Sequence, residues 1–199
     1  MAAKLPYPLA MLQHGEAHDP FGILGKHPDG DKTLVRAFMP SAEEVELDGI
    51  GLMQRLPQTD IFEIRLDAPQ ATALPRHYRL NWLEKGDGRQ HSVISPYSFD
   101  PLLSDLDLHL FSEGRHHHAY RLLGAHLMEV DGILGCRFAV WAPAVRRASV
   151  VGDFNGWNGL RHPMRNRGGS GVWELFIPGL HADDLYKFEF SSRTGQQIL

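Results

Sequence analysis

The sequence predicts an all-β protein made of two tandem immunoglobulin-like β-sandwich modules joined by a short helical linker. Short stretches of alternating apolar and polar residues, broken by Gly, Pro and Asp, are typical of antiparallel sandwiches. Between residues 101 and 111 the apolar spacing changes to that of a helix, and the pattern of the first half then recurs. We therefore expect a first module at 1–97, a linker at 98–119 and a second module at 120–199.

The first half contains a short arm and five expected strands. Prolines at positions 6 and 8 keep any helix in the arm short. In the third and fourth strands the apolar residues recur at every second position, which places them on one face of a sheet. The strands are expected at 33–39, at 45–47, at 62–66, at 78–82 and at 90–94.

The second half contains a strand pair followed by a turn with aromatic residues. The segment 137–142 alternates with a two-residue period, and Pro143 ends it because proline has no N–H for the ladder. A second strand is expected at 147–152. The turn after it is rich in Asp, Asn and Gly. Of the aromatic residues around this turn, Phe154 is expected to fill the core and Trp157 to be displayed at the surface.

Four short segments of the first half recur in the same order roughly a hundred residues later. The pairs are Gly25-Lys-His27 with Gly124-Ala-His126, Ala37-Phe-Met-Pro40 with Val140-Trp-Ala-Pro143, Ile61-Phe-Glu-Ile64 with Val172-Trp-Glu-Leu175, and Tyr78-Arg-Leu80 with Tyr186-Lys-Phe188. Such ordered matches are hard to obtain by chance. The chain is therefore expected to hold two copies of one module.

Composition restricts the class of protein. The chain has 199 residues, 43% of them hydrophobic and 22% charged, as is typical of a globular protein. Its formal charge of −4 is spread without basic clusters, so no nucleic-acid partner is expected. One cysteine excludes an internal disulfide and favours the cytoplasm. We expect no signal peptide and no membrane contact, because no apolar run approaches the roughly 20 residues of a membrane helix.

Other apparent sites have structural interpretations. The three histidines at 116–118 are adjacent, so they would point in different directions and are not expected to bind a metal. Residues 22–26 lack the spacing and the following Ser or Thr of a phosphate-binding loop. Cys136 begins a strand without an acid–base partner and is expected to pack. The sequence therefore predicts no metal and no cofactor.

Six segments in the linker and the second module carry a family resemblance. They are 105–114 (DLDLHLFSEG), 120–126 (YRLLGAH), 137–143 (RFAVWAP), 151–158 (VGDFNGWN), 171–178 (GVWELFIP) and 185–188 (LYKF). Together they closely resemble the N-terminal region of bacterial glycogen branching enzymes, the 1,4-α-glucan branching enzymes, and the likeness covers nearly the whole chain. The resemblance implies an N-terminal module, then a carbohydrate-binding sandwich, then an (α/β)-barrel of the α-amylase clan.

The resemblance also implies a reaction in glycogen synthesis, in which an α-1,4-glucan segment is cut and rejoined through an α-1,6 linkage by way of a covalent glycosyl–carboxylate intermediate. Such chemistry needs two carboxyl groups about 5–5.5 Å apart. The chain has no Asp or Glu in a motif that resembles the active site of that clan, so we expect no catalytic residue and no activity from it alone. The last hairpin, at 194–199, has nothing after it. We therefore expect the front of a longer enzyme, truncated in its second module; a free-standing glucan-binding or scaffold protein is the alternative.

Sugar binding is the chemistry that remains for this chain. In related glycogen-binding sandwiches the Trp of the Gly-x-Phe-Asn-x-Trp turn and the Lys of Tyr-Lys-Phe contact glucan, which implies Trp157 and Lys187 here. Asn155 in the same turn is a third candidate, because amides bond sugar hydroxyls. Such modules often carry a second Trp where this chain has Gln197, so weak binding is expected. Exposed rings also mark protein interfaces, which leaves two partners open for Trp157: the glucan and the downstream barrel.

Overall fold

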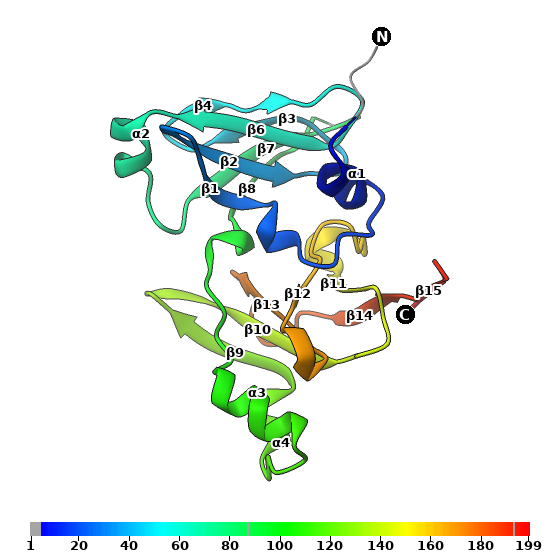
Figure 1. The fold of residues 1–199 in the computed structure, drawn as a ribbon. Coiled ribbons are helices and arrows are strands. Elements are labelled where there is room, and N and C mark those ends of the chain that lie inside the picture. The colour runs from blue at the N-terminus through cyan, green and yellow to red at the C-terminus, as the bar shows by residue number, and fades with distance from the viewer. Residues whose placement is uncertain (1–4, 87, 193) are drawn as a thin grey trace. The chain divides into compact units, whose positions relative to one another are not determined.

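A computed structural model describes residues 5–86, 88–192 and 194–199 (Figure 1). The chain divides into two compact units, Met1–Phe99 and Asp100–Leu199. Both units are built from antiparallel sheets with a few short helices, so the predicted class of two β-sandwich modules is confirmed. No helix in the described part of the chain is long and apolar enough to cross a membrane.

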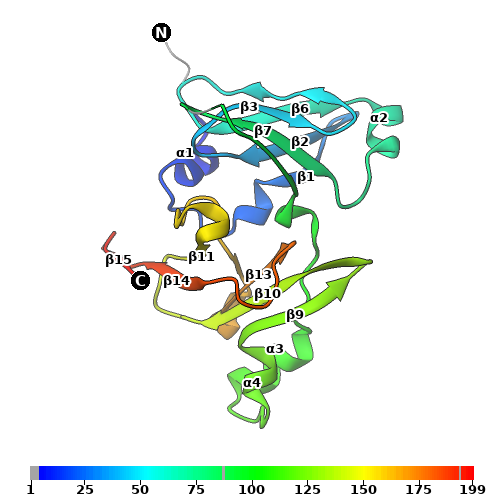
Figure 2. The ribbon, with the colours of Figure 1, turned by 180° about the vertical axis from the view of Figure 1, so that it is seen from behind.

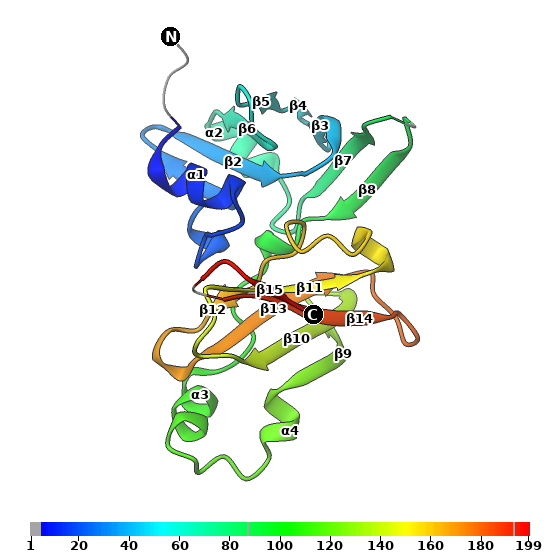
Figure 3. The ribbon, with the colours of Figure 1, turned by 90° about the vertical axis from the view of Figure 1, so that its right-hand side faces the viewer.

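The first unit is a sandwich of two four-stranded sheets, ordered β1-β2-β6-β5 and β4-β3-β7-β8. Its strands are β1 (Gly25–Asp29), β2 (Lys32–Phe38), β3 (Ala42–Leu47), β4 (Gly51–Leu52), β5 (Gln54–Arg55), β6 (Ile61–Leu66), β7 (Arg79–Glu84) and β8 (Gln90–Ile94). Its helices are α1 (Tyr7–Gln13) and α2 (Ala68–Ala73), with 3-10 turns η1 (Pro20–Gly22) and η2 (Pro96–Ser98). Figure 3 shows β7 and β8 as a long hairpin in this unit.

The core of the first unit is formed by the inward side chains of both sheets. Val45 and Leu47 of β3 and Leu80 of β7 are buried, and the partly buried Trp82 packs against the same core, as the two-residue period predicts. The buried side chains of this core include Val35, Ala37, Val45, Leu47, Phe62, Leu66, Tyr78 and Leu80. The opposite face of these two strands carries the pairs Glu44 with Leu83 and Glu46 with Asn81.

The second unit has a four-stranded sheet, β12-β13-β10-β9, and a three-stranded sheet, β11-β14-β15. Its strands are β9 (Gly124–Val130), β10 (Ile133–Trp141), β11 (Arg147–Gly152), β12 (Arg165–Asn166), β13 (Val172–Pro178), β14 (Tyr186–Ser191) and β15 (Gln197–Ile198). Helices α3 (Asp105–Ser112) and α4 (Ala119–Leu122) precede β9 and lie near each other within this unit (Figure 2). The 3-10 turns are η3 (Asp153–Asn155) and η4 (Gly168–Ser170).

The two units repeat one strand arrangement. The order β1-β2-β6-β5 of the first unit corresponds to β9-β10-β13-β12 of the second, and β3-β7-β8 corresponds to β11-β14-β15. The repeated Gly-x-His segment also makes the same contact twice: the Nε2 atoms of His27 and His126 lie 2.9 Å from the carbonyl oxygens of Leu24 and Leu123. The repeat read from the sequence is therefore a repeat of the fold.

The helix expected at 101–111 begins four residues later than predicted, because its first residues have another partner. Glu174, buried in β13, accepts hydrogen bonds from the backbone N–H groups of Leu102 and Leu103 and from Arg167. This holds the chain extended up to Ser104, whose hydroxyl then accepts from the N–H of Asp107 and begins α3. Helix α2 is a short helix that the sequence pattern did not predict.

Replacing Glu174 tests this anchor. Glu174→Ala leaves Arg167 and two buried N–H groups without their acceptor, and we expect it to lower the free energy of unfolding by about 3–5 kcal/mol. The measurement is urea unfolding followed by NMR signals of β10 and β13. The control is Glu129→Ala on the exposed side of β9, expected to change stability by less than about 0.5 kcal/mol. Equal losses in both variants would show that the anchor adds no stability.

Candidate functional site

The candidate site is built on the turn that follows β11. All six residues of β11 are buried, so the strand is locked into its sheet where the turn begins. The turn η3 leads to Gly156 and Trp157, which both have left-handed backbone conformations with φ of 62° and 56°. The N–H of Trp157 donates to the carbonyl of Gly152 at 2.9 Å and closes the loop. A bulky residue in this conformation is an outlier, and such outliers concentrate at functional sites.

Asn155 holds the turn from inside. Its side chain is 1% exposed. The carbonyl oxygen of that side chain accepts from the N–H of Gly152 at 3.0 Å, and its amide nitrogen donates to the carbonyl of Val150 at 2.8 Å. The same nitrogen lies 2.8 Å from Nδ1 of His162. The sequence predicted Phe154 as the residue that fills the core, but Phe154 is only half-buried and Asn155 is the buried one.

Trp157 is displayed at the surface, as its place after the turn predicts. Its side chain is 41% exposed. The indole N–H donates to Oδ1 of Asp153 at 2.8 Å, which restricts the rotation of the ring. The turn therefore presents an apolar ring face whose orientation is set by one hydrogen bond.

His162 supports Asn155 as a neutral imidazole. Burial, together with the nearby charge of Arg161, lowers the pKa of His162 from 6.5 to about 4. At neutral pH its Nδ1 atom can therefore accept the hydrogen bond from Asn155. Its backbone carbonyl also accepts from the N–H of Val150 at 3.1 Å, so the residue contacts both β11 and the turn η3.

A buried ion pair lies under the remainder of this loop. Arg147 of β11 pairs with Glu189 of β14, and their side chains are 3% and 10% exposed. Arg147 also donates to the carbonyl of Gly159 at 3.3 Å. A Cβ atom on Gly159 would lie 1.9 Å from a Glu189 oxygen, so a glycine is needed for the loop to approach this closely. Sequence analysis missed this pair, because Arg147 and Glu189 lie on strands that are far apart in the sequence.

Lys187 lies on β14, the strand next to the turn. It is exposed, and it pairs in register with Val151, the residue before Gly152. Its neighbour Tyr186 is 37% exposed, and its ring packs against that of Phe138 with centroids 4.9 Å apart. Asn155 and Trp157 therefore lie in one turn, and Lys187 lies on the adjacent strand β14.

The arrangement can do the chemistry of a weak sugar site. An exposed indole offers a flat apolar surface, which suits the C–H face of a sugar ring, and an ammonium or carboxylate group beside it can bond hydroxyls. The buried position of Asn155 leaves its amide engaged within the turn. Cys136 is also buried, and this raises the pKa of its thiol. Among the described residues no three His, Cys, Asp or Glu side chains are grouped so that they could hold a metal ion.

The fold defines a protein of two tandem antiparallel β-sandwich modules, the second of which displays an aromatic turn. Residues 122–199 match the family described as Carbohydrate-binding module 48 (Isoamylase N-terminal domain). Residues 6–97 match the alpha-1,4-glucan branching enzyme GlgB, N-terminal domain. The chain therefore has the two-module N-terminal region of the GlgB branching enzymes.

Individual relatives agree with the family matches. The chain is 56% identical over 193 residues to the 1,4-alpha-glucan branching enzyme GlgB of Thiobacillus denitrificans, covering 96% of this chain and 26% of that protein. It is 53% identical over 188 residues to the enzyme of the same name from Hydrogenovibrio crunogenus, covering 94% of this chain and 26% of that protein. The chain thus spans about a quarter of the length of these curated relatives. A solved pullulanase from Anoxybacillus sp. LM18-11 matches 84% of this chain and 24% of its own, at 12% identity and a TM-score of 0.29.

The support of the turn by His162 predicts a pH dependence. Because the folded pKa lies below the unfolded value, this contribution to stability is complete above pH 6.5 and is lost as the pH falls towards 4. Between pH 7.5 and 5 we expect the second module to lose about 2 kcal/mol through this residue.

Urea unfolding followed by NMR signals of β11 and β14 measures this loss. His162→Gln should show a smaller decline with pH, because glutamine does not titrate. His181→Gln, at an exposed position, is the matched control and should decline like the unmodified chain. A decline of the same size in the His162 variant would contradict the assignment.

Proposed function

We propose that the second module binds α-glucan, with the ring of Trp157 as its stacking surface and Lys187 as a hydrogen-bonding partner. The observation that carries the proposal is the ring itself: it is exposed, its orientation is set by Asp153, and it stands on a left-handed backbone in a module of a carbohydrate-binding family. Asn155 has a different role in this proposal. Its buried amide positions the turn and does not contact sugar.

We further propose that the chain is the non-catalytic front of a glycogen branching enzyme. Relatives named 1,4-alpha-glucan branching enzyme support this, together with the order of the two matched families. The transfer of α-1,4-glucan segments to α-1,6 linkages then belongs to the part of those relatives that this chain does not match. In this proposal the modules occupy 1–97 and 120–199, residues 98–119 connect them, the partners are glucan and the downstream barrel, and the location is cytoplasmic.

The surface around Trp157 has a second candidate partner. An exposed aromatic ring is also suited to a protein interface, here with the downstream barrel. The two candidate partners predict different oligosaccharide binding by the isolated chain. If the ring faces glucan, the chain binds oligosaccharide through it; if the ring faces protein, its loss leaves oligosaccharide binding unchanged.

Affinity for glucan tests the proposal directly. With one ring available, we expect the chain to bind maltoheptaose with a Kd in the high-micromolar to millimolar range, roughly 4–6 kcal/mol. Trp157→Ala should weaken binding about tenfold, because the stacking surface is lost. Lys187→Ala should weaken it less, about twofold to threefold, because an exposed lysine gives up side-chain entropy when it binds.

Affinity electrophoresis in glycogen gels and NMR titration with maltoheptaose provide the measurements. Trp141→Ala is the matched control, since Trp141 is another tryptophan of the second module, 55% exposed at the end of β10 and outside the turn. It should leave binding unchanged. Equal retardation of the unmodified chain and the Trp157 variant would assign the ring to a protein contact.

A further inference from the structure

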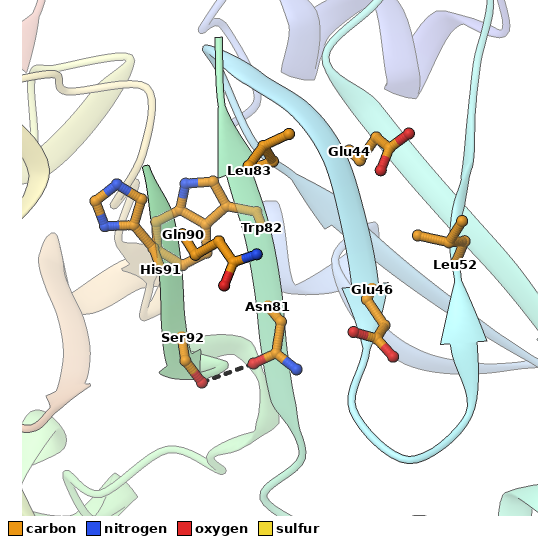
Figure 4. Close-up of a pocket in the computed structure, with 9 residues that line it drawn as sticks. All are labelled: Glu44, Glu46, Leu52, Asn81, Trp82, Leu83, Gln90, His91 and Ser92. Carbon is orange, nitrogen blue, oxygen red and sulfur yellow. Dashed lines mark hydrogen bonds between the residues drawn. The ribbon is translucent and has the colours of Figure 1, made fainter. Parts of the chain in front are cut away.

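The first module has a groove on the outer face of the sheet β4-β3-β7-β8. Its volume is about 370 Å³, which falls within the range of ligand sites. Figure 4 shows that its side chains come from all four strands of this sheet. The lining residues are Glu44, Glu46, Leu52, Asn81, Trp82, Leu83, Gln90, His91 and Ser92.

The internal repeat relates this groove to the proposed glucan site of the second module. Leu80 pairs with Leu47 in the first module, as Phe188 pairs with Val150 in the second. One position earlier, Arg79 therefore corresponds to Lys187, as the matching Tyr78-Arg-Leu and Tyr186-Lys-Phe segments also indicate. The groove thus lies on the same face of the same sheet as Lys187.

Loop length explains why this face is open in the first module. In the second module the connection after β11 is long, and it places Gly159 on Glu189, whose position corresponds to Asn81. In the first module only residues 48–50 connect β3 to β4. The connection is too short to cover the sheet, so the polar side chains of β3 and β7 stay accessible.

The groove offers hydrogen-bonding groups in fixed positions. Ser92 donates to the side-chain oxygen of Asn81 at 2.7 Å, and the Asn81 amide nitrogen donates to Asp48 at 3.1 Å, which orients both residues. Within the described ranges, the carboxylates of Glu44 and Glu46 have no hydrogen bond or ion pair. They remain able to accept hydrogen bonds from a ligand.

Apolar surface lies beside these polar groups. Leu52 is 67% exposed on β4, opposite Glu46 in register, and Leu83 lines the groove from β7. Trp82, which pairs with Val45 and packs against the core, stacks on the ring of His91 with centroids 4.8 Å apart and so supports the sheet behind the groove. A row of acceptors and amides flanked by apolar side chains suits a neutral polyol with hydroxyl edges and C–H faces.

We propose that this groove is a second α-glucan-binding site, separate from the one proposed in the second module. The inference rests on the proposed function for the identity of the ligand. Two unpaired carboxylates could also attract a basic peptide. The leucines, the amides of Asn81 and Gln90 and the repeat relation to Lys187 favour the sugar.

NMR titration of the full chain with maltoheptaose tests this site. We expect amide signals of β3, β7 and β8 to shift, and these shifts to persist in Trp157→Ala, which removes the ring in the other module. Asn81→Ala should weaken binding at the groove about fivefold to tenfold, because one oriented amide is lost. The control is Glu43→Ala, an exposed carboxylate beside the groove that does not line it, and it should leave the titration unchanged.

The outcomes separate this site from the proposed function. Shifts confined to residues 151–158 and 186–188 would overturn the groove and retain the function of the second module. Shifts at the groove alone would support the groove site and overturn glucan binding by the second module. If neither place shows shifts, both proposals are overturned. A response of the groove to tetralysine but not to maltoheptaose would reassign it to a basic partner and overturn the proposal. If Asn81→Ala fails to fold, Leu52→Ala at the exposed edge takes its place and should weaken binding in the same direction.

Discussion

The candidate site depends on the amide of Asn155. Both the oxygen and the nitrogen of this side chain form hydrogen bonds to the backbone within the turn. These bonds fix the backbone between Val150 and Trp157. An apolar residue there would leave the N–H of Gly152 and the carbonyl of Val150 without partners in a buried place. Because the buried amide of Asn155 forms these hydrogen bonds, the turn does not need the side chain of Trp157 to form them, and its ring can lie at the surface.

Buried charged side chains are paired in both units, and in the second unit they also hold connecting segments onto the sheets. In the second unit Glu174 binds the segment that precedes α3, and Arg147, paired with Glu189, donates to the loop at Gly159. In the first unit the corresponding strand carries Glu63, which pairs with two arginines. Each such group is costly to bury alone and is tolerated because it has partners: loop groups for Glu174, and strand residues for Glu63 and for the Arg147–Glu189 pair. The strands of the repeat provide the frame, and these ionic contacts determine where the connections lie.

The two modules differ where their connections differ. The shared strand order places Arg79 of the first unit and Lys187 of the second at corresponding positions, on the same face of corresponding sheets. A long connection covers that face in the second unit and carries the exposed ring, whereas a short connection leaves a polar groove in the first. One architecture thus presents two surfaces of different chemistry. Loop length and the residues beneath the loop decide which surface appears.

Much of this protein can be predicted from its sequence, because its signals are local. The alternation in β6 and β10, the proline after β10 and the ordered repeat are enough to predict two β-sandwiches, and the turn composition indicates that Trp157 is displayed. The burial of Asn155 and the pairing of Arg147 with Glu189 could not be predicted in this way. Both depend on which side chains meet across strands and loops distant in sequence. Alternation says which face a residue takes, but only tertiary structure decides whether a loop covers that face.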